Sequence, residues 1–221
     1  MEIAPGVTDA DWNRLRDKLC PDNIDETISE NGASIKLWDK AVHIFKSRIE
    51  TRYIKPVDLL IDIHRQQKQV AATDMNIEKD RIRPGFAILT LDFIIIETIQ
   101  GFKSGILDHT GNSQELIKNF LLDSSEFPEI YKEGFAVFIY KAFRCQLTHK
   151  GQTNGDFLVS DSGASSINKH SYDSTTINRN KFHEAVCGAF TRYCSELLEN
   201  TDNGRTLRRN FLVKFDSICK R

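Results

Sequence analysis

The chain has 221 residues, of which 40% are hydrophobic and 28% are charged. This length and composition exclude a fibrous or wholly disordered protein, and they suffice for a buried core without disulfides or bound metals. The formal net charge of −1 excludes a surface that is basic throughout, so a nucleic acid would have to bind at a local site.

The five cysteines are an odd number, and they show neither C-x-x-C spacing nor clustered histidines. They therefore indicate neither a disulfide framework nor a zinc site, and we expect no metal and no resident cofactor. The N-terminus lacks the basic start and apolar run of a secretory signal, so we expect a cytoplasmic protein.

The N-terminal part of the chain is predicted to be helical. Thr8 followed by Asp11 has the pattern of a helix N-cap, and a short helix should follow it. Apolar residues recur every three to four positions over residues 34–49, which predicts a long amphipathic helix. The pattern continues over 57–67, with a kink expected at Pro56.

The central part of the chain contains its most apolar segment. Residues 69–85 lack a period and predict a loop with a basic tip. Residues 86–102, FAILTLDFIIIETIQGF, are apolar on nearly all sides and predict a helix at the centre of a bundle. Their longest apolar run is about half the ~20 residues of a membrane span, so we expect no membrane contact. Asp92 and Glu97 would be costly to bury unpaired, and Arg144 is a candidate partner for one of them.

The C-terminal half has a non-helical segment between helices. Its predicted helices cover residues 114–123, 129–149, 181–199 and 205–221. Residues 151–178 are rich in Gly, Ser, Asn and Asp, with FLV and TTI as strand-like pieces, and predict a small β-hairpin or irregular insert. The expected fold class is therefore mainly α, a helical bundle formed by residues 1–221 as one domain.

Arg144 and His149 lie late in the helix predicted over 129–149, in the stretch IYKAFRCQLTHKGQT. About one such pair is expected by chance, but this arginine directly follows Phe143 in a helix that otherwise belongs to the core. The alternative is that Arg144 extends from the core edge while His149 caps the last carbonyls. Side chains five residues apart point about 140° apart around an α-helix, so a second copy of the helix could complete a site.

An arginine followed after four residues by a histidine, late in a core helix, resembles the signature of HEPN-domain proteins. The resemblance covers about residues 84–200 and includes the buried segment LDFIIIETIQGF. It implies a helical bundle that forms a homodimer with the motifs facing each other and, in many members, a metal-independent ribonuclease. It also implies a role in bacterial defence or as a toxin, with RNA as substrate and an antitoxin or defence protein as a further partner.

The resemblance implies a role for each residue of the motif. His149 would be the general acid or base, and Arg144 would hold the scissile phosphate, leaving 2′,3′-cyclic phosphate and 5′-hydroxyl ends. Cys145 stands where active members most often have asparagine. A non-catalytic module for dimerisation, partner binding or nucleotide binding is therefore the alternative.

Several neighbouring side chains are weaker candidates. Tyr140 lies one turn before the arginine and would contact a phosphate or a base, although an aromatic residue at this spacing is more often part of the core. Lys150 and Gln152 would contact the RNA backbone. Arg179 and His183 share one face at the start of a helix and could bind an anion there, although a solvated first turn is the simpler reading. His64 is one of four histidines to which we assign no chemistry.

Overall fold

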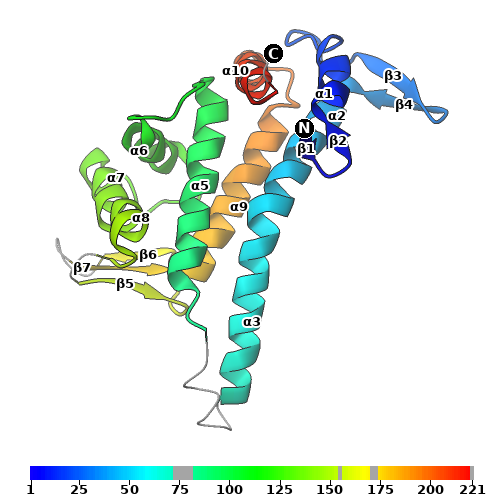
Figure 1. The fold of residues 1–221 in the computed structure, drawn as a ribbon. Coiled ribbons are helices and arrows are strands. Elements are labelled where there is room, and N and C mark those ends of the chain that lie inside the picture. Colours follow the sequence, from blue (N-terminus) through cyan, green and yellow to red (C-terminus); the bar gives the residue numbers. More distant parts are fainter. Residues whose placement is uncertain (72–81, 154–155, 170–173, 220–221) are drawn as a thin grey trace. The chain divides into compact units, whose positions relative to one another are not determined.

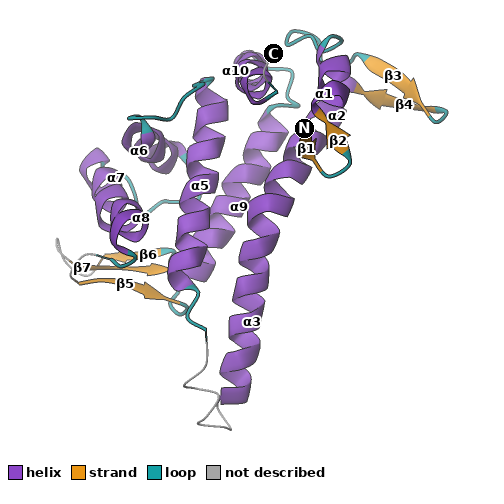
Figure 2. Cartoon of the chain, viewed as in Figure 1, coloured by secondary structure: helices purple, strands orange, loops and turns teal. Residues whose placement is uncertain are grey.

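The computed structural model describes residues 1–71, 82–153, 156–169 and 174–219. It is predominantly helical, as the sequence predicted, and it also contains small β-sheets (Figures 1 and 2). The chain forms two compact units, which are described separately. Unit 1 comprises residues 1–52, 98–113 and 190–221, and unit 2 comprises residues 53–97 and 114–189. Most of the loop predicted at 69–85 lies outside the described residues.

Unit 1 contains two small antiparallel sheets and several helices. Its elements are β1 (Glu2–Ala4), β2 (Val7–Thr8), α1 (Asp9–Arg16), β3 (Thr27–Glu30), β4 (Ala33–Lys36), α2 (Leu37–Ile49), α10 (Asp202–Ile218) and the C-terminal parts of α5 (Gly85–Ser104) and α9 (Arg179–Glu196). The Thr8 N-cap is confirmed, because Thr8 and Asp11 form a capping box. The helix predicted from residue 34 begins instead at Leu37, because Ala33–Lys36 pairs with β3 in a hairpin.

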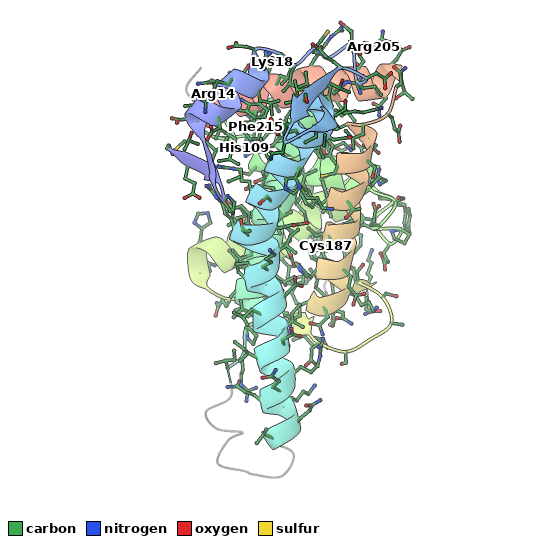
Figure 3. The ribbon with its side chains drawn as sticks, turned by 90° about the vertical axis from the view of Figure 1, so that its right-hand side faces the viewer. Arg14, Lys18, His109, Cys187, Arg205 and Phe215 are labelled. Atoms are coloured by element: carbon green, nitrogen blue, oxygen red, sulfur yellow. The ribbon has the colours of Figure 1, made fainter. Side chains whose placement is uncertain are left out.

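An aromatic cluster fills the core of unit 1. The Phe45 ring lies 4.5 Å from that of Phe102 and 5.4 Å from that of Phe211, measured between centroids. Phe215 on α10 (Figure 3) stacks against Trp12 with a centroid distance of 3.9 Å. These buried rings come from four helices, so their contacts fix how the helices of this unit pack.

The helix predicted to kink at Pro56 contains a π turn at that point. Glu50–Ile54 is π-helical and joins α2 directly to α3 (Lys55–Ala71). Proline has no N–H for the helical ladder and its ring clashes with the preceding turn. A wider turn just before Pro56 accommodates both effects without ending the helix.

Unit 2 holds the predicted motif. Its elements are α3, most of α6 (Ser113–Asp123), α7 (Glu133–Ile139), the π turn η2 (Tyr140–Cys145), α8 (Gln146–Lys150), β5 (Asp156–Ser160), β6 (Ile167–Lys169), β7 (Ser174–Asn178) and the N-terminal parts of α5 and α9. The segment predicted as one helix over 129–149 begins only at Glu133. Residues 124–130 form successive hydrogen-bonded turns before it, and Pro128 lies within them. Gly151 ends the segment with φ of 64°, as predicted.

The insert at 151–178 forms a three-stranded sheet in the order β5-β7-β6. The two strand-like pieces of the sequence, FLV and TTI, lie in β5 and β7, but these strands pair in parallel. The hairpin is made instead by β6 and β7. Figure 1 shows α7 and α8 beside this sheet, and Phe138 and Phe143 both contact Phe157 of β5. The sheet therefore supports the helical segment that carries the motif.

Helix α5 is long and apolar enough to cross a membrane by length and composition alone. However, 67% of its most apolar window is buried, as in the core helix of a soluble protein, so this is weak evidence for a span. Asp92 in this helix is fully buried. The pattern that predicted a central core helix is thus matched by the burial of α5.

Candidate active site

Arg144 is anchored by a buried carboxylate. Its Nη2 lies 3.3 Å from both side-chain oxygens of Glu97 on α5. Only 10% of the Glu97 side chain is exposed, against 22% of the Arg144 side chain. Of the two carboxylates that the sequence offered as partners for Arg144, Glu97 is the one that pairs with it. The pairing restricts the position of the guanidinium.

Tyr140 and Cys145 form a second contact inside the same π turn. Burial and a hydrogen bond with Cys145 raise the pKa of the Tyr140 phenol to about 12. The charges of Arg144 and Glu97 also influence this pKa, which places all four groups in one neighbourhood. Tyr140 therefore stays neutral at physiological pH, and its side chain remains partly exposed.

His149 lies at the surface, unlike Arg144. It is in the last turn of α8, and its side chain is exposed, as are those of Lys150 and Gln152. In the part of the chain that the structure describes, the His149 side chain makes no hydrogen bond or ion pair. The capping role considered for His149 is therefore not seen, and the imidazole is accessible to a ligand or to another protein molecule.

The π turn changes the geometry expected for the pair. A π turn holds more residues than an α turn, so it shifts the faces that the flanking side chains occupy. Arg144 lies within the turn and lines a small cavity of about 110 Å³ with Phe93 and Leu147. His149 lies in the following α-helical turn. The protomer therefore provides an anchored arginine and an exposed histidine, and His149 does not line the cavity that Arg144 lines.

Asp92 is not part of this cluster. Its carboxylate pairs with His183 of α9, whose Nδ1 lies 2.6 Å away. The other ring nitrogen of His183 lies 3.4 Å from the Cys187 thiol and 3.4 Å from the Asp58 carboxylate. Figure 3 shows Cys187 midway along α9. The solvated first turn expected for α9 is therefore wrong, because His183 is buried and its first-turn neighbour Arg179 is buried too.

The Asp92–His183 pair is an ion pair at neutral pH. Burial raises the pKa of Asp92 to about 6, against the lowering influence of His183. Burial alone would lower the pKa of His183, but the hydrogen bond and charge of Asp92, together with Cys187, raise it to about 10. The folded protein therefore holds a proton on His183 over a pH range in which the unfolded chain has released it.

This proton makes stability depend on pH. The stabilisation from His183 is complete below pH 6.5, its ordinary pKa, and is lost as the pH rises through about 10. We expect wild type to lose more unfolding free energy than a double variant, Asp92→Leu with His183→Leu, which lacks both titrating groups, by a few kcal/mol between these pH values. Urea unfolding at both values measures the difference. Equal losses in the two proteins would contradict the assignment.

The sequence analysis also did not predict a second polar cluster, which is centred on Arg179. Arg179 contacts His64 and Asp161, and the three side chains border a cavity of about 720 Å³. The spacing of Arg179 and His183 was a signal, but it suggested one shared anion site. The two side chains instead reach different partners. Among the described residues, no group of three or more His, Cys, Asp or Glu side chains is arranged to hold a metal ion.

Comparisons with known proteins identify no relative of this chain. No family model matches the sequence, and neither the curated proteins nor the solved structures contain a significant match.

Proposed function

We propose that this protein is a metal-independent endoribonuclease of HEPN-like type that acts as a homodimer. The observation that carries the proposal is a contrast within one helical segment. Arg144 is anchored by buried Glu97, whereas His149 is exposed and makes no hydrogen bond within the described residues. A histidine with a purely structural role would be covered and bonded within its own chain. An accessible imidazole five residues along the chain from an oriented guanidinium suits general acid–base catalysis on a phosphodiester.

The proposed reaction follows from these two groups. The imidazole of His149 takes the proton of a ribose 2′-hydroxyl, and the resulting oxygen attacks the adjacent phosphorus. The bond from phosphorus to the 5′-oxygen breaks, and that oxygen takes up a proton. Arg144 stabilises the negative charge on the phosphate. The products are a 2′,3′-cyclic phosphate and a 5′-hydroxyl, and no metal is required. Glu97 orients Arg144, while Tyr140 would contact a phosphate or a base, and the exposed Lys150 and Gln152 would contact the RNA backbone.

The two groups are proposed to meet across a dimer. Arg144 lines a cavity that His149 does not line, and two facing copies would bring each arginine to the partner copy's histidine. The setting implied by the resemblance is the bacterial cytoplasm, as a toxin or defence protein with its own protein partner. Cys145, in the place of the usual asparagine, favours the alternative of a non-catalytic module, and the following experiment distinguishes the two.

Mixing two inactive variants tests the composite site. Arg144→Ala and His149→Ala should each be inactive as homodimers. After mixing and subunit exchange, half of the dimers carry one variant chain of each kind, and one of their two sites is intact. We expect roughly a quarter of the wild-type RNA cleavage rate to return. An inactive mixture with an active wild type would place both groups in one protomer. A folded but inactive wild type would support the non-catalytic module.

A further inference from the structure

Three side chains of unit 2 form a hydrogen-bonded chain that ends in a thiol. Nδ1 of His183 on α9 donates to the Asp92 carboxylate of α5 over 2.6 Å, and Nε2 donates to Sγ of Cys187 over 3.4 Å. His183 and Cys187 are four residues apart on α9, so they share one face of that helix. The sequence of carboxylate, imidazole and thiol places a nucleophilic atom beside a positioned proton donor.

The imidazole in this chain is charged and held in place. His183 is only 3% exposed, and Asp92 is fully buried. Burial alone would lower the pKa of His183, but the hydrogen bonds and charges of Asp92 and Cys187 raise it to about 10. Both nitrogens of the ring therefore carry a proton at neutral pH. Because Asp92 fixes the Nδ1 edge, the direction of the proton on Nε2 is set as well.

Two of the other cysteines are protected by burial. Burial raises the pKa of the Cys194 thiol to about 12 and that of the Cys219 thiol to about 11. Both thiols are therefore protonated at neutral pH, and both residues are buried. Because the thiolate is the nucleophilic form of cysteine, we expect these two residues to be inert.

The remaining cysteines are accessible to solvent but have different surroundings. Cys20 is exposed, whereas Cys145 and Cys187 are partly exposed. The Cys145 thiol is hydrogen-bonded to the phenol of Tyr140, which stays neutral. The Cys187 thiol is hydrogen-bonded to the charged ring of His183, which can give up a proton. Cys187 thus combines access from solvent with an adjacent proton donor.

We propose that Cys187 is a site of oxidation by hydroperoxides, with His183 as the proton donor. After the thiol has lost its proton to solvent, the sulfur attacks one oxygen of hydrogen peroxide. An S–O bond forms as the O–O bond breaks, and the sulfur is oxidised by two electrons. The leaving hydroxide takes the Nε2 proton of His183 and departs as water, and His183 regains a proton from solvent. The product is a sulfenic acid, which thiol reductants return to the thiol.

Asp58 on α3 competes for the same proton. Its carboxylate lies 3.4 Å from Nε2 of His183, as far away as the sulfur of Cys187. The Asp58 side chain is 57% exposed, so the fold should tolerate its replacement. Asp58→Asn removes the competing charge, and we expect it to speed the oxidation of Cys187 by about two- to five-fold, the usual effect of one exposed charge.

Trapping of the sulfenic acid at each cysteine tests the proposal. The folded full-length protein is treated with hydrogen peroxide at neutral pH in the presence of dimedone, and the label on each cysteine is quantified by mass spectrometry. Cys187 should be labelled at least about ten-fold faster than Cys20, although Cys20 is the more exposed residue. Labelling of Cys20 as fast as that of Cys187 would show that exposure alone sets the rate, and it would overturn the proposal.

A double variant, Asp92→Leu with His183→Leu, removes the proton donor together with its partner, so neither charge is left buried alone. It should slow the labelling of Cys187 at least about ten-fold and leave that of Cys20 unchanged. Unchanged labelling of Cys187 in this variant would overturn the proposed role of His183. Labelling of buried Cys194 reports any loss of the fold, and in that case Asp58→Asn decides.

Asp62→Asn is the matched control for the Asp58 variant. Asp62 is also on α3 and is 56% exposed, but it pairs with Arg65. Its replacement should leave the labelling rate of Cys187 at the wild-type value. A rate that does not rise in Asp58→Asn, or that rises equally in both variants, would contradict the competition for the His183 proton and overturn the proposal.

Discussion

Replacing His149 with alanine is expected to lower the rate constant of RNA cleavage by about 10²- to 10⁴-fold, the usual contribution of a general acid or base. The fold should be unaffected, because the side chain is exposed and makes no hydrogen bond among the described residues. Surface substitutions of this kind change the free energy of unfolding by less than about 0.5 kcal/mol. Single-turnover cleavage of a labelled RNA, together with urea unfolding of the same samples, measures both quantities.

His43 provides the matched control for this variant. It is also exposed and lies on α2 in unit 1, outside the proposed site. His43→Ala should cleave RNA at the wild-type rate. Equal activity of His149→Ala and wild type would contradict the catalytic assignment, and equal losses in both histidine variants would point to a general effect of surface charge.

Replacing His183 with alanine is expected to lower the free energy of unfolding by about 3–5 kcal/mol. The change leaves Asp92 fully buried and deprives it of its partner 2.6 Å away. In a protein of this size the melting temperature should fall by roughly 10 °C. Urea unfolding and thermal unfolding followed by circular dichroism measure the two values.

A double variant separates the ion pair from simple loss of packing. Replacing both partners, His183→Leu with Asp92→Leu, removes both charges and fills the same space with apolar side chains. Such replacements are often neutral or stabilising, so the double variant should be more stable than His183→Ala. Additive destabilisation by the two changes would show that the groups are not coupled in the folded protein.

The ends of helices were predictable from the sequence where they depend on residues close together in the chain. The Thr8 capping box and the Gly151 helix stop were both predicted, because each needs only a few residues to form. The burial of α5 followed from its uniformly apolar composition. The same composition indicated that Asp92 and Glu97 would need partners, since an unpaired buried carboxylate is costly.

The choice of partners was not predictable. Asp92 pairs with His183, which lies 91 residues away, whereas Glu97 pairs with Arg144, 47 residues away. Such pairings depend on how the helices pack, and no local pattern specifies that packing. The π turn at Tyr140–Cys145 adds a second limit, because it changes the helical phase on which the predicted 140° separation rested.

The pairing of the strands could not be predicted either, because it also depends on contacts that no local pattern specifies. The pieces FLV and TTI were recognised as strand-like, but two strands close in sequence are most simply joined as an antiparallel hairpin. The third strand, Ile167–Lys169, is short and polar and gave no signal of its own. It occupies the antiparallel position beside β7 and leaves the parallel position to β5.

The chemistry of the RNA ends tests the central claim most directly. Wild-type protein is incubated with an RNA and with a DNA of the same sequence in the presence of EDTA, and the product ends are identified by mass spectrometry. The proposed mechanism predicts cleavage of the RNA alone, leaving 2′,3′-cyclic phosphate and 5′-hydroxyl ends, because the 2′-hydroxyl is the attacking group. Cleavage that needs a metal ion, products with 5′-phosphate ends, or cleavage of the DNA would contradict it.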